Sequence, residues 1–144
     1  MLGQGLLSTE LHPDLISAYQ RACYRIAERF DVRIDDYSPD LDCWQQQQSV
    51  ETSALITAYN PKSQRGSHAD NRVATRQLEQ WIVETRWPYC PAINLDPQDQ
   101  WPPEPGFLIG GLDQSQAESL ARTFGQNALV WTRSDAVPRL LLLR

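Results

Sequence analysis

ALITAYNPKSQ, residues 54–64, is the stretch from which the fold of this chain is best predicted. Its apolar start stops at Asn60–Pro61, a dipeptide typical of turns. The polar loop that follows contains, in order, Lys62, Ser63, Gln64, Arg65 and Gly66. A buried strand that ends in a polar loop is a common place for ligands in proteins that combine helices and sheets. We therefore predict a strand over residues 52–59 and a candidate site directly after it.

Two helices are predicted downstream of this strand. Apolar residues recur at helical spacing over residues 68–86, and Ser67 stands where a helix cap is expected. A second helix is predicted to begin after Asp113, because Gln116 three positions later completes a reciprocal capping arrangement. Gly125 then stands where a left-handed residue ends a helix.

Short apolar runs predict the remaining strands of this half. They cover residues 89–93, 107–109, 127–131 and 139–143, and the last two are spaced as a hairpin. Pro91 lacks the N–H that a strand interior needs, so we expect the first of these strands near a sheet edge. Between it and the next lies a long Pro- and Asp-rich loop, residues 94–106.

In the N-terminal third of the chain, the sequence pattern predicts one helix and one strand. Pro13 suits a first helical turn, and an apolar stripe at helical spacing extends the predicted helix over residues 13–28. Alternating apolar and charged residues predict a strand over residues 30–34, and residues 37–40 have turn chemistry. Residues 41–50 are expected to form a helical turn or two.

From residue 52 onward the predicted order is β-α-β, β-α-β and one further strand. This is the split βαβ order of ferredoxin-like domains. We therefore expect an α+β fold, with a mostly antiparallel sheet and its helices packed on one face. The N-terminal helix and strand add to this core, and residues 1–144 are expected to form a single domain.

Composition narrows the class of protein. The chain is 41% hydrophobic and has a formal charge of −5, which disfavours general nucleic-acid binding. Its three widely spaced cysteines and two histidines predict neither a disulfide framework nor a metal site, and they favour a reduced, cytoplasmic setting. Residues 1–11, MLGQGLLSTEL, lack the features of a signal peptide, and no apolar run is long enough to cross a membrane.

Four segments together carry a resemblance to a known family: ITAYNPKSQ (56–64), Asn71–Arg72, EPGFLIGG (104–111) and FGQNALVW (124–131). The chain resembles the DUF3293 family, small bacterial proteins of unknown function, over nearly its whole length. The resemblance implies a single domain and a bacterial origin. It implies no reaction, cofactor or catalytic residue.

The candidate binding site lies in the loop and helix start after the strand at 52–59. Residues 60–76 contain four Lys or Arg side chains against one acid, Asp70. A helix N-terminus attracts anions, and arginine forms bidentate contacts with phosphate or carboxylate. We expect a small anionic or nucleotide-like ligand, with two amide side chains opposite the basic loop. The predicted binding residues are Asn60, Ser63, Arg65, Asn71, Arg72, Gln126 and Asn127. The alternative is a turn, a helix cap and a solvated basic face without a ligand.

No GxSxG, P-loop, GxGxxG or HExxH pattern occurs, so the sequence favours binding over catalysis and predicts no cofactor. The rival function is a protein-interaction or regulatory module without a small ligand. Such a module would contact its partner through an exposed edge of the sheet and through Trp101, which is expected to be exposed in the long loop. The other role open to Trp101 is to cover a pocket.

Overall fold

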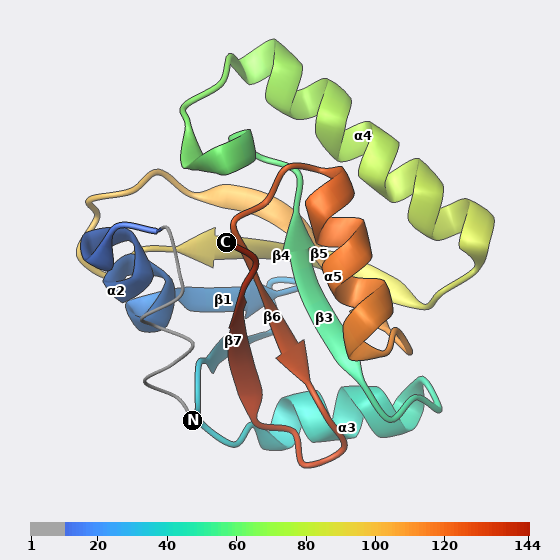
Figure 1. Ribbon diagram of the computed structural model, residues 1–144. Helices are drawn as coiled ribbons and strands as arrows, with labels where there is room; N and C mark the ends of the chain where they lie inside the picture. The colour runs from blue at the N-terminus through green and yellow to red at the C-terminus, as the bar shows by residue number, and fades with distance from the viewer. Residues whose placement is uncertain (1–10) are drawn as a thin grey trace.

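The computed structural model describes residues 11–144, apart from the side chain of Lys62. The expectation that the chain has no signal peptide concerns residues 1–11, nearly all of which lie outside the described residues. The described residues form a seven-stranded antiparallel sheet with α-helices packed against it, which confirms the predicted α+β class (Figure 1). The helices are α2 (Pro13–Arg21), α3 (Pro39–Gln47), α4 (His68–Thr85) and α5 (Gln114–Thr123).

The strands follow the order β2-β1-β4-β5-β3-β6-β7 across the sheet. Their bounds are β1 (Cys23–Ile26), β2 (Phe30–Arg33), β3 (Ser53–Thr57), β4 (Tyr89–Leu95), β5 (Glu104–Gly110), β6 (Ala128–Thr132) and β7 (Pro138–Leu142). The predicted strand at 52–59 is thus β3, which pairs with β5 on one side and β6 on the other. β6 and β7 pair as the expected hairpin.

Both faces of the sheet are covered, and β3 contributes to each. On one face, Ala54 and Ile56 pack with side chains of α4 and α5, among them Leu78 and Leu120. On the other face, Leu55 packs in a second cluster with Leu108 and Val130 of the neighbouring strands. Leu41 and Trp44 of α3 belong to this second cluster. The helices α4 and α5 therefore share one face as predicted, whereas α3 lies on the opposite face.

The sheet curls until its two edges meet. The backbone N–H of Asp35, just after β2, donates to the carbonyl of Pro138 in β7 at 2.7 Å. The N–H of Ser38 donates to the carbonyl of Ala136 at 3.0 Å. These bonds join the ends of β2 and β7, which are the outermost strands of the sheet, so the second cluster lies on an enclosed, concave side.

The prediction of one helix over residues 13–28 is wrong, because α2 ends at Arg21 and β1 begins at Cys23. Ala22 already has an extended backbone, with φ −61° and ψ 147°. β1 has strand partners on both sides, β2 and β4. These long-range ladders outweigh a local apolar spacing that also fits a helix.

The prediction that the proline-marked strand lies near an edge is also wrong, since β4 lies between β1 and β5. The ladder between β1 and β4 ends at the pair Ile26 and Ala92. Pro91 is the next residue, and its carbonyl accepts from the N–H of Ala27, where β1 turns away. The missing N–H of Pro91 therefore falls where the ladder stops.

The turn chemistry at residues 37–40 proves to be a helix start. The hydroxyl of Ser38 accepts from the N–H of Leu41, and Pro39 occupies the first turn of α3. The capping box of Asp113 and Gln116 is confirmed, as is the left-handed backbone of Gly125. None of the helices formed by residues 11–144 combines the length and the apolar character needed to span a bilayer.

Candidate functional site

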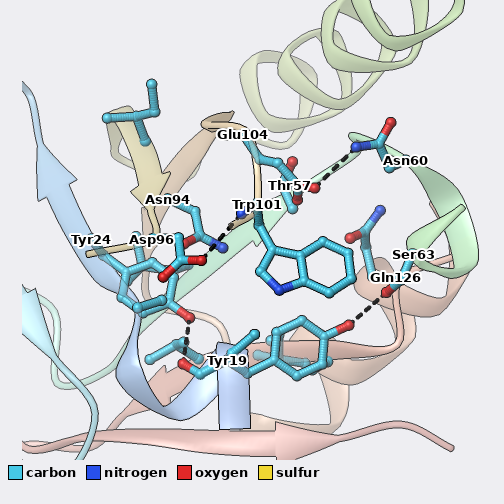
Figure 2. A pocket seen from close by; sticks show the side chains of 18 of the residues that line it. Tyr19, Tyr24, Thr57, Asn60, Ser63, Asn94, Asp96, Trp101, Glu104 and Gln126 are labelled. Atoms are coloured by element: carbon cyan, nitrogen blue, oxygen red, sulfur yellow. Dashed lines mark hydrogen bonds between the residues drawn. The ribbon is translucent and has the colours of Figure 1, made fainter. Parts of the chain in front are cut away.

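A cavity of about 330 Å³ lies on the concave side of the sheet, next to α2 (Figure 2). Its apolar wall includes Leu55 and Val130, which also belong to the second core cluster, and Leu140 of β7. The side chains of α3 fill part of this face, but small residues line the space near α2. They are Ala18, Ala22, Ala92, Gly106 and Ala128. The cavity therefore exists because the sheet encloses more volume than these side chains fill.

Gly106 permits the close approach of two strands beneath the cavity. A Cβ atom at this position would lie 2.6 Å from the carbonyl oxygen of Ile56 in β3. That distance is shorter than any real contact, so only glycine fits without moving the backbone. The absence of a side chain also keeps this part of the cavity wall open.

The structure brings four of the seven predicted site residues to this cavity. Asn60, Ser63 and Arg65 line it from the loop after β3, and Gln126 lines it from the segment before β6. Asn71 and Asn127 are not among its lining residues, although both hydrogen-bond to residues that are. Arg72 is exposed on α4 and is not a lining residue either.

Asn60 has a left-handed backbone, with φ 45°, and both ends of its amide form hydrogen bonds within the protein. Its Nδ2 donates to Oε2 of Glu104 at 3.0 Å. Its Oδ1 accepts from Nδ2 of Asn71 and from the N–H of Gly66, each at 2.9 Å. Asn60 therefore holds the loop to α4 and fixes the position of the Glu104 carboxyl.

Ser63 connects the loop to α2 and β6. Its Oγ lies 2.7 Å from the hydroxyl of Tyr19 and accepts from Nδ2 of Asn127 at 2.8 Å. Burial raises the pKa of the Tyr19 phenol, so this hydroxyl stays protonated and neutral. Asn127 is buried, and its Oδ1 is without a hydrogen-bond partner among the described groups. The described partners of the Ser63 hydroxyl are Tyr19 and Asn127, and neither is a base that would make it a nucleophile.

The amide orientation of Gln126 is fixed by its two acceptors. Its Nε2 donates to the carbonyls of Tyr59 and Phe124, at 3.1 and 3.2 Å. Its Oε1 therefore faces away from these carbonyls, and in Figure 2 it points toward the Trp101 indole. No described group donates to Oε1.

Glu104 is the chemically most distinctive residue of the cavity, and sequence reasoning missed it. It begins β5, shares a face with Gly106 and Leu108, and lines the cavity. Burial raises the pKa of its carboxyl, while the hydrogen bond from Asn60 acts in the opposite direction. The predicted strand was too short at 107–109. Extending its alternation back through Pro105 would have placed Glu104 on the inward face.

Asp96 anchors the loop that carries Trp101 over the cavity. Its carboxylate accepts from Arg21 of α2, at 2.9 and 3.1 Å. It also accepts from the backbone N–H groups of Gln98, Gln100 and Trp101. The Arg21 guanidinium, helped by these N–H groups, holds the pKa of Asp96 well below its usual range. Trp101 is 41% exposed, as predicted, and lines the cavity.

The described residues offer few groups for covalent or metal chemistry. Burial raises the pKa of the Cys90 thiol to about 11 and raises that of Cys23, so neither is a thiolate near neutral pH. Within residues 11–144, His, Cys, Asp and Glu side chains do not gather in threes as a metal site requires. The arrangement is suited to holding a small molecule by shape and hydrogen bonds.

Fold and site together define an α+β protein with a partly enclosed cavity on the concave side of a curled antiparallel sheet. The family model described as a protein of unknown function, DUF3293, matches residues 56–129. That is just over half of the chain, so this chain belongs to the DUF3293 family. The matched span runs from the end of β3 to the start of β6 and contains the loop after β3, Glu104 and Gln126. No curated protein and no solved structure matches the chain, and the ferredoxin-like comparison stays a prediction.

Proposed function

We propose that this protein binds a small molecule in the cavity between α2 and the concave side of the sheet. The observation that carries the proposal is the lining itself, which combines an apolar wall with polar side chains, among them Asn60, Glu104 and Gln126. A volume of about 330 Å³ lies in the range of ligand pockets, roughly 300–1,000 Å³. The free cysteines of the chain are in keeping with a cytoplasmic setting, which is part of the same proposal.

The charges of the lining favour a neutral or cationic molecule over the anion expected from sequence. Arg72 and Arg76 are exposed on α4 and do not line the cavity, which leaves Arg65 as the one cationic side chain among its described lining residues. Two carboxyl groups also line it, Asp96 and Glu104. Asp96 is neutralised by Arg21, but Glu104 has no ion pair among the described side chains.

A library of small aromatic and aliphatic molecules with neutral, cationic and anionic head groups tests the proposal. Binding is measured by ligand-observed NMR and by the rise in melting temperature that a ligand of the native state produces. Ala128→Leu fills part of the cavity and should weaken every true ligand about tenfold or more. Ala69→Leu, on the exposed face of α4, is the matched control and should leave binding unchanged.

Trp101→Ala supplies the second variant. Trp101 is exposed enough that its loss should leave folding intact while it weakens binding in the cavity. The proposal fails if no compound binds the wild type, or if bound compounds are insensitive to both Ala128→Leu and Trp101→Ala. In that case the protein-interaction alternative, which also uses Trp101, would become the leading hypothesis.

A further inference from the structure

Two side-chain oxygen atoms of the cavity, one from Glu104 and one from Gln126, accept no hydrogen bond from a described group. The side chains that carry them bond to two consecutive residues, Tyr59 and Asn60. Oε2 of Glu104 accepts from Asn60, while its Oε1 accepts from no described group. The Nε2 of Gln126 donates to the backbone carbonyls of Tyr59 and Phe124. Its Oε1 likewise accepts from no described group. Because Tyr59 and Asn60 are adjacent, both acceptors are anchored at the same end of the cavity.

The charge at this end is uncompensated. Glu104 is half-buried, and no described Lys, Arg or His forms an ion pair with it. Two tyrosine hydroxyls interact with this carboxyl, those of Tyr19 and Tyr24, and both stay neutral because burial raises their pKa values. A carboxylate that is partly removed from water and has no cation beside it lowers the stability of the fold, and a cationic ligand offsets that cost.

The remainder of the cavity fits an apolar body attached to such a cation. Leu55, Val130 and Leu140 form the apolar wall. The indole of Trp101 lies between the Glu104–Asn60 pair and the Tyr19–Ser63 pair in Figure 2. An aromatic face attracts a cationic nitrogen, and the effect adds to that of a carboxylate.

We propose that the cavity recognises small primary amines, with the ammonium group bound by Oε1 of Glu104 and Oε1 of Gln126 and the apolar body against the wall of Leu55 and Val130. An ammonium has three N–H donors and no acceptor, which matches a site that offers acceptors and one negative charge. This inference rests on the proposed binding function and names the chemical class of its ligand.

The preference for a head group is tested with three probes that share one apolar body and differ only in the polar group. They are 2-phenylethylamine, 2-phenylethanol and 3-phenylpropionate. Their affinities are measured by titration calorimetry or by protein-observed NMR at neutral pH. The amine should bind the wild type at least about tenfold more tightly than the alcohol, since charge-assisted hydrogen bonds are about twice as strong as neutral ones. The carboxylate should bind most weakly.

Glu104→Gln removes the charge and keeps an acceptor for Asn60. It should abolish the preference for the amine while the alcohol binds as before. Glu84→Gln makes the same chemical change on the exposed face of α4 and should preserve the preference. Circular dichroism verifies that both variants are folded, and the wild-type series alone decides the head group if Glu104→Gln does not fold.

The outcomes separate this inference from the proposal beneath it. The amine class is wrong if the alcohol or the carboxylate binds the wild type as tightly as the amine, or if folded Glu104→Gln keeps the preference. Either result leaves small-molecule binding in the cavity intact. Failure of all three probes, together with failure of the wider library, contradicts the binding function itself.

Discussion

Asn60 and Asn71 form a reciprocal pair: the backbone N–H of Asn60 donates to Oδ1 of Asn71, and Nδ2 of Asn71 donates back to Oδ1 of Asn60, both at 2.9 Å. The pair joins the end of β3 to the first turn of α4. Both residues were predicted to contact a ligand, but these amide atoms are used within the protein. Their role in the structure is to hold the loop that lines the cavity.

Asn71→Ala should therefore destabilise the fold. Asn71 is buried, and its loss leaves the N–H of Asn60 without its partner, at a cost of about 1–3 kcal/mol in the free energy of unfolding. Urea denaturation measures the loss. Arg72→Ala, at the next and exposed position, should change stability by no more than about 0.5 kcal/mol. Equal effects of the two substitutions would contradict the structural role of the pair.

Gly125 joins the same loop to the end of α5. Its φ of +70° is left-handed, and a Cβ atom there would lie 2.9 Å from Cβ of Pro61. Gly125→Ala should cost about 1–2 kcal/mol from backbone conformation alone, and more if Pro61 must move. Gly125→Asn should cost less, because asparagine tolerates the left-handed region. An alanine variant as stable as the wild type in urea would contradict both the cost of the left-handed backbone and the tight contact with Pro61.

The sequence was sufficient for the elements whose signals are local. The capping box at Asp113, the left-handed Gly125 and the strand ended by Asn60–Pro61 all depend on residues within a few positions of one another. Each is decided by short-range hydrogen bonds and sterics, which a sequence pattern records directly.

The elements that were mispredicted depend on distant partners. Cys23–Ile26 is a strand because β2 and β4 flank it, and Pro91 is tolerated in an inner strand because β1 turns away beside it. The side of the sheet that α3 covers likewise depends on distant partners, because Leu41 and Trp44 pack there against Leu55 and Val130. No local spacing encodes these relationships.

The sequence indicated which segments form the candidate site, but it did not indicate the chemistry of that site. The loop after β3 and the FGQN segment do meet, since Gln126 donates to the carbonyl of Tyr59 and Asn127 donates to Ser63. Glu104 and Tyr19 come from segments that carried no functional signal. Their part in the cavity follows from the folding of β5 and α2 around it.

Asp96→Asn should loosen the loop that carries Trp101. The substitution removes the charge that pairs with Arg21 and that receives three backbone N–H groups. The amides of Gln98, Gln100 and Trp101 should then exchange with solvent several-fold faster, as measured by hydrogen exchange. Asp99→Asn is the matched control in the same loop, because Asp99 is exposed and its left-handed backbone suits asparagine. Unchanged exchange in Asp96→Asn would show that the backbone alone holds the loop.

Glu104→Gln should stabilise the unliganded protein at neutral pH. Burial raises the pKa of Glu104 in the folded state, so the folded state binds its proton more tightly than the unfolded state does. The stability that comes with the protonated form is therefore complete below the ordinary pKa of about 4.3 and is lost as the pH rises through the raised value. Above the raised pKa the ionised carboxyl lowers the stability of the folded state, and the neutral amide of glutamine removes that cost.

The difference in melting temperature between Glu104→Gln and wild type should thus be positive at pH 7 and should shrink toward about pH 4. Taking the difference at each pH cancels the titration of Asp96 and of other groups common to both proteins. Glu84→Gln, which removes an exposed carboxyl hydrogen-bonded to Gln80, should show no such trend. A destabilised Glu104→Gln at pH 7, or a difference independent of pH, would mean that the carboxyl is already balanced within the protein. A carboxyl balanced in that way would not need a cationic ligand, so this measurement on the free protein also bears on the amine proposal.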